Sequence, residues 1–547
     1  MLEIRERQRH IFLELEALGA PAEKSRMLRG AVMLTSTVET ASPLATTRCG
    51  KVRGSLAGGI HAFKGVPYAA PPFGAHRLRA PQPAESWTGV RSATDNGPKP
   101  PQIAFPGTPP GGRLPWDRAA AGEDCLNLNV WTPDPGRVRL PVMVWMTGGA
   151  FHVGSAAWYD GRRFARDGVV CVSINYRVGA EGFLYLSDAV ANRGLLDQIA
   201  AMEWVRDNIA AFGGDPDNVT LCGESAGAMS IGSLLAMPRA KGLFRRAILQ
   251  SGAAHHVISA DRARRVGELF AEKLGIEASL EAMATVPVDQ MLAAQMEVEA
   301  DLAAHPDPQR WGLDVVASAM PLQPVIDGDS IPGSPLELIR SGASSGVDVM
   351  VGTNVDDWRL FLAMTGALDQ ITERVLTGPV AEHGYQCAAA YGLPVEQALA
   401  AYRAASPTAS PGDLLAAIQT DWWCRIPAIR LADAHVNDGA RTFMYEFGWR
   451  SPVANGLFGS CHALEIPFVF DTLDDGPTQM VGDLLGENPP QQLANIMHSA
   501  WVSFIKRGDA GWPEYDLGRR ATMTFNTISS VADDPRSRER ELWEGTR

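Results

Sequence analysis

The chain has 547 residues, a net charge of −13 at pH 7, 46% hydrophobic residues and a mean hydropathy of −0.07. These values are typical of a soluble globular protein, and the negative charge argues against nucleic acid or an anionic membrane as partner. No run of 18 or more apolar residues occurs, so we expect no transmembrane helix. The length allows about two to four domains, although large α/β enzymes often form one unit.

Residues 1–46 are predicted to form a peripheral N-terminal extension. Ile11, Leu15 and Leu18 recur at helical spacing before a Gly-Ala-Pro stop, and a Ser/Thr-rich stretch follows. The first ten residues are rich in charge where a signal peptide needs an apolar core, which favours a cytoplasmic location.

The seven cysteines are scattered along the chain and lack the C-x-x-C spacing of a metal site. Several fall in apolar runs, where a free cysteine packs as a small core residue. A reducing compartment is the simpler interpretation, and we expect neither a metal nor another cofactor.

Strand-like apolar runs alternate with helical ones through the first half of the chain. The strand-like runs cover residues 140–146, 169–176, 219–222 and 247–249, and a helical run covers 198–211. Hydrophobic runs of this kind, each followed by a helix, predict an α/β fold with a mostly parallel sheet buried on both faces. A late strand at 442–447 and a helix at 493–505 complete it.

The turn Gly223-Glu224-Ser225-Ala226-Gly227 carries the first chemical signal. It follows the strand-like run 219–222 and precedes a helical run that Pro238 closes. A strand, a sharp turn with serine at its tip and then a helix form the context of a nucleophile elbow. The small glycines let strand and helix approach each other, and the first N–H groups of the helix favour negative charge near Ser225.

A second G-x-S-x-G pattern, Gly342-Ala343-Ser344-Ser345-Gly346, serves as an internal control. It follows a helical stretch and precedes the strand-like run 347–351, which is the reverse order of an elbow. We interpret it as an ordinary loop, and the comparison leaves Ser225 as the candidate nucleophile.

Several further motifs occur in a fixed order along the chain: Phe63-Lys64-Gly65-Val66-Pro67-Tyr68-Ala69, Glu123-Asp124-Cys125-Leu126-Asn127, Asn175-Tyr176-Arg177-Val178-Gly179, Asp197-Gln198 and Phe212-Gly213-Gly214-Asp215-Pro216. Together with the elbow, they resemble the type-B carboxylesterase and cholinesterase-like family of α/β-hydrolases, of the bacterial para-nitrobenzyl-esterase-like kind. The resemblance covers about residues 47–525.

The resemblance implies a single α/β-hydrolase domain over residues 47–547, with a central, mostly parallel twisted sheet flanked by helices. Helical cap insertions are implied around residues 260–320 and 360–440. Secreted family members pair the cysteine of the Glu-Asp-Cys-Leu motif with an upstream cysteine, which residues 97–102 lack. Cys125 therefore has no such partner, in agreement with a reducing location.

The resemblance also implies a catalytic triad in the chain order serine, acid, histidine. Its acid loop corresponds to Gly352-Thr353-Asn354-Val355-Asp356-Asp357-Trp358, which places the acid at Asp357, with Asp356 as the alternative. The family has Glu at the acid position and Gly after it. The base corresponds to His462 in the loop 459–468, where Glu465 and Pro467 are expected to brace the loop.

The oxyanion hole is implied at the backbone N–H groups of Gly148, Gly149 and Ala226. The family motif begins with a histidine that helps to hold the loop, and Thr147 replaces it here, so we expect a looser or differently braced loop. Candidate pocket walls are aromatic or apolar and equally suited to core packing; they are Phe151, Val153, Trp158, Tyr159, Trp358 and Phe458.

These features predict a metal-independent serine carboxylesterase that works through an acyl-enzyme, and the run 148–151 resembles one associated with bulky, even tertiary, alcohol esters. An amidase or carbamate hydrolase with the same triad is one alternative, and a catalytically impaired binding module is another. A small-molecule ester is the expected partner, with neither nucleic acid nor membrane, and the protein is expected to be a monomer or small homo-oligomer.

Overall fold

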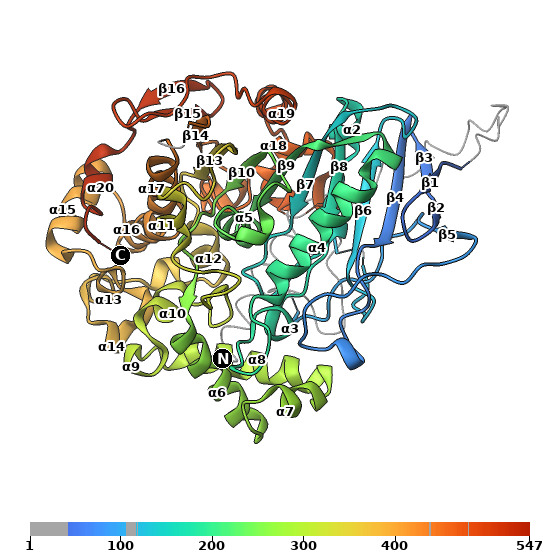
Figure 1. Ribbon diagram of the computed structural model, residues 1–547. Helices are drawn as coiled ribbons and strands as arrows, with labels where there is room; N and C mark the ends of the chain where they lie inside the picture. Colours follow the sequence, from blue (N-terminus) through green and yellow to red (C-terminus); the bar gives the residue numbers. More distant parts are fainter. Residues whose placement is uncertain (1–41, 105–115, 118, 437–438, 480, 547) are drawn as a thin grey trace, which may run out of the picture.

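The computed structural model of the protein describes residues 42–104, 116, 117, 119–436, 439–479 and 481–546 (Figure 1). The predicted N-terminal helix lies outside the described residues. Strand β1 (Leu44–Thr46) begins inside the segment predicted as an extension and pairs with β2 (Lys51–Arg53), which pairs with β5 (Val90–Ser92). These three strands form a small sheet beside the main one.

The main sheet has eleven strands in the order β16-β15-β14-β13-β10-β9-β7-β8-β6-β4-β3. The seven strands from β15 to β8 run parallel, and antiparallel strands lie at both edges. Figure 1 shows the sheet spanning the molecule from β16 to β3. The strands are β3 (Ser55–Ala57), β4 (Ile60–Pro67), β6 (Asn127–Thr132), β7 (Leu140–Met146), β8 (Val170–Ile174), β9 (Gly214–Glu224), β10 (Arg246–Gln250), β13 (Asp348–Asn354), β14 (Thr442–Phe447), β15 (Ala521–Phe525) and β16 (Ser530–Asp533).

The central strands are apolar on both faces because each face has its own hydrophobic core. Along β7, Val142 and Val144 belong to one core, and Met143 and Trp145 belong to the other. Helices α4 (Arg193–Asn208), α5 (Ala226–Leu234) and α17 (Ile426–His435) cover the first face, and α2 (Arg162–Arg166), α18 (Ile466–Phe470) and α19 (Gln491–Arg507) cover the second. The predicted doubly covered, mostly parallel sheet is therefore confirmed.

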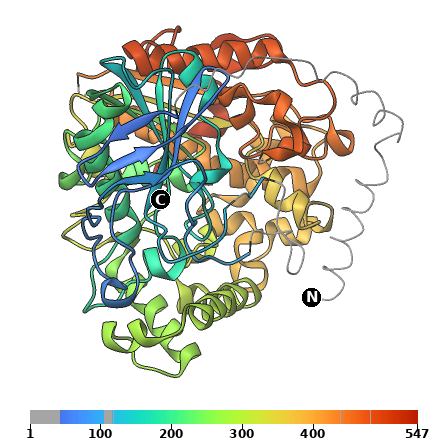
Figure 2. The same ribbon diagram turned by 90° about the vertical axis from the view of Figure 1, so that its right-hand side faces the viewer.

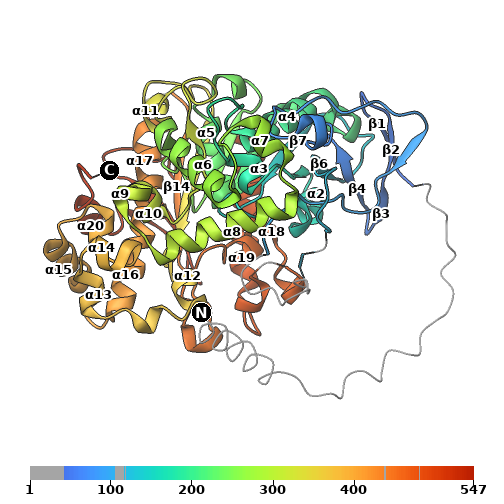
Figure 3. The same cartoon turned by 90° about the horizontal axis from the view of Figure 1, so that it is seen from below.

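Two helical segments follow strands of the main sheet where caps were expected. The first comprises α6 (Ala260–Leu274), α7 (Leu280–Thr285), α8 (Val288–Ala304), α9 (Pro308–Trp311) and α10 (Leu313–Ser318). Figures 1 and 2 show its helices at the bottom of the molecule, opposite α19 at the top, and Figure 3 shows α8 running across this end. The second segment includes α12 (Arg359–Met364), α13 (Glu373–Thr377), α14 (Val380–His383), α15 (Val395–Ala405), α16 (Pro411–Thr420) and a π-helical turn, η8 (Asp421–Arg425).

The fold brings three distant loops to one edge of the sheet. Ser225 directly follows β9, Asp357 follows β13, and His462 lies in the loop after β14. These strands are parallel, so the loops after them meet at the carboxyl edge, where open α/β sheets place their ligand sites. Among the described residues, no helix is both long enough and apolar enough to cross a membrane.

Candidate active site

Ser225 lies at the tip of a tight turn between β9 and α5. Its backbone has φ 56° and ψ −125°, a conformation that the surrounding structure must hold in place. Gly227 makes the turn possible, because a Cβ atom there would lie 2.2 Å from the carbonyl oxygen of Met146. The Ser225 N–H donates to the Gln250 carbonyl oxygen at 2.9 Å. The turn therefore has the geometry of a nucleophile elbow.

The second G-x-S-x-G pattern lies in a different setting. Ser344 is buried in a turn that joins α11 (Pro335–Arg340) to β13. The helix comes before the strand, as predicted, and the serine has an ordinary backbone rather than the positive φ of Ser225. Context therefore distinguishes the two matches.

Asp357 and His462 form a buried pair. Asp357 Oδ1 lies 2.8 Å from His462 Nδ1, and the two side chains are 1% and 6% exposed. Asp357 Oδ2 accepts the Asn354 N–H at 3.0 Å, and the His462 N–H donates to the Asp357 carbonyl oxygen at 3.1 Å. Because the carboxylate holds Nδ1–H, Nε2 is the ring atom left to accept a proton.

The neighbouring Asp356 faces away from the imidazole. Its Oδ2 lies 2.8 Å from Arg450 Nη1 and accepts the Ser460 N–H at 2.9 Å. Its own N–H donates to the Ser460 carbonyl oxygen at 3.0 Å. Asp356 thus braces the loop that carries His462, while Asp357 bonds to the ring.

Glu224, which the sequence reasoning left without a role, contacts the other side of the ring. Its Oε1 lies 3.0 Å from His462 Nε2 as an ion-pair contact whose angles do not make a hydrogen bond. Burial acts to lower the pKa of His462, but the charge of Glu224 and the hydrogen bonds that the ring makes with Asp357 and Cys424 outweigh it and raise the pKa well above its ordinary value. The signal in the sequence was an acid directly before the candidate nucleophile.

Glu465 braces the carboxyl edge, as expected. Its Oε1 accepts from Gln250 Nε2 at 3.0 Å, and its Oε2 accepts from Asn354 Nδ2 at 2.6 Å. Burial, together with the charges of Glu224 and Asp357, raises the pKa of Glu465 to about 7. Pro467 lies in the first turn of α18, which follows the loop. The histidine loop, β10 and β13 are thus joined by buried hydrogen bonds.

Cys424 also lies beside the Asp357–His462 pair, although the sequence gave no reason to place it there. The donor atoms of these three side chains lie within 4.8 Å of one another, a grouping of the kind that can hold a metal ion. Burial and the charge of Asp357 raise the pKa of the Cys424 thiol, which keeps it protonated. The thiol donates to the Ser251 carbonyl oxygen at 3.6 Å, while Asp357 and His462 are joined by their own hydrogen bond.

The turn after β7 brings Gly148 and Gly149 against the nucleophile. A Cβ atom on Gly148 would lie 2.8 Å from the Glu224 carbonyl oxygen and 3.2 Å from Ser225 Cβ. Three consecutive residues have positive φ: 114° at Gly149, 52° at Ala150 and 63° at Phe151. Ala226 lies on the other side of Ser225, at the start of α5. Gly148 and Ala226 therefore lie on two sides of Ser225, and Gly149 follows Gly148 in the same turn.

Thr147, at the position of the family's histidine, is buried and held through its backbone. The Tyr176 hydroxyl donates to the Thr147 carbonyl oxygen at 2.6 Å. Gly154 lies close by, because a Cβ atom there would lie 2.7 Å from Thr147 Oγ1. These two contacts hold the Thr147 end of the turn in this protein.

The predicted pocket residues are all buried. Trp358 packs against Phe361 at a ring-centroid distance of 4.7 Å, and Phe361 lies 5.3 Å from the His462 ring. Phe361, which the sequence did not single out, is therefore the aromatic ring at the imidazole. The other predicted residues pack in the hydrophobic cores; they are Phe151, Val153, Trp158, Tyr159 and Phe458.

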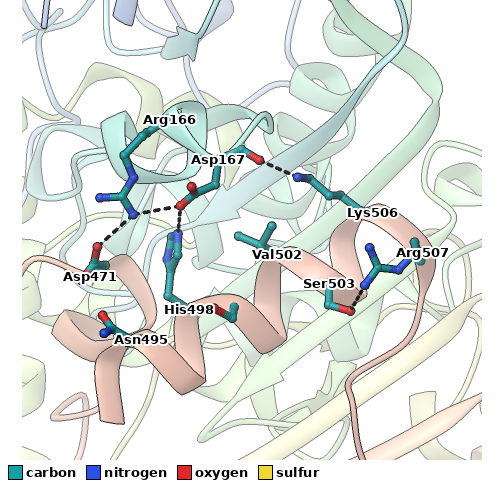
Figure 4. A pocket seen from close by; sticks show the side chains of 10 residues that line it. Arg166, Asp167, Asp471, Asn495, His498, Val502, Ser503, Lys506 and Arg507 are labelled. Atoms are coloured by element: carbon teal, nitrogen blue, oxygen red, sulfur yellow. Dashed lines mark hydrogen bonds and ion pairs between the residues drawn. The ribbon is translucent and has the colours of Figure 1, made fainter. Parts of the chain in front are cut away.

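A cavity of about 380 Å³ lies elsewhere, between α2 and α19 (Figure 4). Asp167 Oδ2 binds Arg166 and His498 there, both at 2.9 Å, and Lys506 donates to the Asp167 carbonyl oxygen at 2.5 Å. Arg166 also reaches Asp471 at 3.0 Å. These contacts join the two helices, and none of the predicted site residues lines the cavity.

Comparison with known proteins identifies the family of the chain. The chain matches the carboxylesterase family over residues 41–543. It is 37% identical to the para-nitrobenzyl esterase of Bacillus subtilis over 519 residues, or 91% of this chain and 98% of that protein. It is 35% identical to the phenmedipham hydrolase of Pseudarthrobacter oxydans over 479 residues, or 85% and 90% of the two chains.

Among solved structures, the carboxylesterase Est55 of Geobacillus stearothermophilus superimposes with a TM-score of 0.76 at 36% identity, over 91% of this chain and 99% of that one. The fold is therefore that of an α/β-hydrolase. The chain belongs to the carboxylesterase family and is a carboxylic ester hydrolase.

Proposed function

We propose that the protein hydrolyses carboxylic esters through an acyl-enzyme formed on Ser225. The observation that carries the proposal is the strained Ser225 turn at the same sheet edge as the buried 2.8 Å Asp357–His462 pair. A serine hydroxyl needs a base to take its proton, and the base needs a third group to orient it. Asp357, rather than Asp356, is the orienting acid because its carboxylate bonds to the ring.

In the first half of the reaction, His462 Nε2 takes the Ser225 proton as Oγ attacks the ester carbonyl. The oxyanion is held by the N–H groups of Gly148, Gly149 and Ala226. His462 then protonates the leaving alcohol, and water releases the acyl group by the same steps. Among the described residues, no hydrogen bond joins His462 to Ser225, and such bonds often tighten only when substrate binds.

Glu224 acts on the same proton transfers through its charge. Its carboxylate lies 3.0 Å from Nε2, the atom that becomes positively charged when the serine proton arrives. A nearby opposite charge favours that imidazolium. The contact also links the histidine loop to the residue directly before the nucleophile.

The covalent step can be tested with a fluorophosphonate probe, which labels activated serines. We expect labelling of Ser225 and hydrolysis of p-nitrophenyl esters, both lost in Ser225→Ala. Ser344→Ala, in the second pattern, should label fully. Hydrolysis that persists in Ser225→Ala would remove Ser225 from the mechanism.

Carbamate hydrolysis by the same residues is a second candidate. The 35% identical phenmedipham hydrolase favours it, and the triad chemistry applies to either bond. A matched aryl acetate, aryl carbamate and anilide would separate ester, carbamate and amide preference. Tertiary alcohol esters belong in the same panel, because the run 148–151 resembles one associated with bulky alcohols.

We also propose that residues 47–547 act as one catalytic domain, with the segments around 260–320 and 360–440 as caps. All seven cysteines are free, which supports a reducing, cytoplasmic location. The net charge of −13 supports a partner list limited to small-molecule esters, with no nucleic acid or anionic membrane. A monomer or small homo-oligomer is the proposed state.

A further inference from the structure

The oxyanion turn is strained, and the hydrogen bonds inside it run from the N–H groups of His152 and Val153 to the Gly149 carbonyl oxygen. Ala150 and Phe151 both adopt positive φ, at 52° and 63°, directly after Gly149 at 114°. Non-glycine residues hold such angles only where their surroundings impose them. The turn also lacks the family's histidine at position 147. A strained turn whose N–H groups must be placed accurately therefore depends on contacts from elsewhere.

One such contact comes from His152, the residue after the strained pair. Its Nδ1 lies 2.9 Å from Glu299 Oε1, and the side chains are 11% and 24% exposed. Glu299 belongs to α8, in the first cap segment, about 150 residues along the chain. The ion pair thus joins the oxyanion turn to the cap.

Glu299 is held in place by Gln295, which lies one turn earlier on α8 and also binds α3 (Gly179–Phe183). Gln295 Nε2 donates to Glu299 Oε1 at 2.8 Å, and Gln295 Oε1 accepts the Ala180 N–H at 3.1 Å. Burial acts to raise the pKa of Glu299, but the charge and hydrogen bond of His152, with the hydrogen bond from Gln295, outweigh it and hold the pKa below its ordinary value. The carboxylate is therefore ionised and ready to orient the imidazole.

Helix α8 also supports the turn indirectly, through Gly179. This glycine is the first residue of α3 and lies between α8 and the turn. The Gly179 N–H donates to the Phe151 carbonyl oxygen at 2.6 Å. A Cβ atom on Gly179 would lie 2.4 Å from Gln295 Oε1, so α8 packs directly onto this residue. Figure 1 shows α8 beside α3. The turn, the start of α3 and α8 thus form one packed unit.

We propose that Glu299 is a positioning residue for ester hydrolysis: through its ion pair with His152 it holds the oxyanion turn in its catalytic conformation. The cap helix α8 then supplies part of the support that the family's histidine supplies elsewhere. The inference rests on the proposed acyl-enzyme function, because only a reaction that develops an oxyanion needs the turn to be held. It predicts that cap variants change the chemical step and not only substrate binding.

The test compares Glu299→Ala and Glu299→Gln with Glu297→Ala, a matched control from the exposed side of the same helix. Steady-state kinetics would use p-nitrophenyl esters. We expect Glu299→Ala to lower kcat about tenfold with little change in KM, which is less than the 10²–10³ of losing a whole oxyanion donor. Glu299→Gln keeps an acceptor for His152 and should recover part of the loss, and Glu297→Ala should match the parent.

A trifluoromethyl ketone inhibitor gives a readout that a merely structural role would not move. Ser225 Oγ adds to its carbonyl carbon, the serine proton passes to His462, and the carbonyl oxygen becomes an oxyanion in the hole. The inhibition constant should rise in Glu299→Ala by about the factor by which kcat falls, since both depend on the same donors. Glu299→Gln carries the test if Glu299→Ala does not fold.

The pair can be isolated by a double-mutant cycle with His152→Ala. If the two residues act together, the double variant should be no slower than the slower single variant, because the second change removes nothing further. Unchanged kcat and ketone affinity, or a change in KM alone, would overturn the proposal. A parent protein that neither labels with fluorophosphonate nor hydrolyses esters would instead overturn the acyl-enzyme function.

Discussion

Asp357 and His462 are held from within the sheet, whereas the turn at residues 148–151 is held partly from the cap. The first pair lies on loops after core strands and is joined to them by buried hydrogen bonds through Asn354 and Glu465. The second has three consecutive positive φ angles and an ion pair to Glu299, whose side chain is 24% exposed. The proton-transfer half is therefore held by buried hydrogen bonds beside the core strands, whereas the turn at residues 148–151 has a contact from helix α8.

This difference teaches where variation should be tolerated. Replacing a residue of the buried network removes a partner from a group that has no alternative, so the effect is large and local. The oxyanion turn receives support from several segments, including Tyr176, Gly179 and α8. Loss of one support should weaken the turn by degrees, and three substitutions test the contrast.

The largest effect is expected from Asp357→Asn. The amide cannot hold Nδ1–H of His462 as the carboxylate does, so the ring loses the tautomer in which Nε2 accepts a proton. We expect kcat to fall by about 10⁴, the loss typical of this change in a serine triad. Single-turnover kinetics with a p-nitrophenyl ester would measure it.

Asp356→Asn is the matched control for that variant. Its carboxylate pairs with Arg450 and the Ser460 N–H rather than with the imidazole. Its effect on kcat should be much smaller, with some loss of thermal stability. Equal losses of kcat in the two variants would mean that kcat depends on the conformation of the histidine loop and not on the hydrogen bond between Asp357 and His462.

Gly149→Ala should have the next largest effect. Its φ of 114° is unfavourable for alanine, and the new Cβ atom would lie 2.2 Å from the Val153 carbonyl oxygen, so the turn must shift. We expect kcat to fall by about 10²–10³, the loss typical of one missing oxyanion donor. Circular dichroism would verify that the fold is retained.

Gly366→Ala separates the cost of a positive φ angle from the displacement of the turn by the new Cβ atom. Gly366 also has positive φ, at 66°, but a Cβ atom there would meet nothing within 4 Å. It should lose about 1–2 kcal/mol of stability from the backbone alone and keep its kcat. If Gly149→Ala behaved like Gly366→Ala, the turn would not supply the oxyanion donors.

The sequence predicted the sheet better than the contacts between its loops. Strands β7 and β14 lie at the predicted residues 140–146 and 442–447, because doubly buried parallel strands are continuous apolar runs. The order of the motifs along the chain indicated that Ser225 and His462 belong to one site, and both lie in loops at the carboxyl edge of the sheet. The register of the acid loop favoured Asp357 but left Asp356 as the alternative, since both follow the same strand and only the turn geometry decides which carboxylate reaches the ring.

Contacts between distant segments could not be predicted from the sequence either, because they depend on the direction in which each side chain points after packing. The segment around 260–320 was recognisable as helical, but helix periodicity does not say which acid of α8 faces another loop. Glu297 and Glu299 differ only in the direction in which the packed helix turns them. The contact between Glu224 and His462 likewise depends on how two loops meet. The sequence did not predict it, although Glu224 directly precedes the candidate nucleophile.

The smallest effect is expected from Glu224→Gln, and it concerns pH more than rate. His462 must be unprotonated to accept the serine proton, so activity is lost as pH falls through its pKa. Burial lowers that pKa, whereas the charge of Glu224 and the bond from Asp357 raise it, with a net rise. Removing the Glu224 charge should therefore move the acid limb of the kcat/KM profile to lower pH, with a loss of maximal rate smaller than that of Gly149→Ala. Asp356→Asn, which leaves the ring untouched, should keep the limb in place. An acid limb that stayed fixed in Glu224→Gln would mean that the 3.0 Å contact packs the ring without raising its pKa, and His462 would then owe its base strength to the hydrogen bond with Asp357.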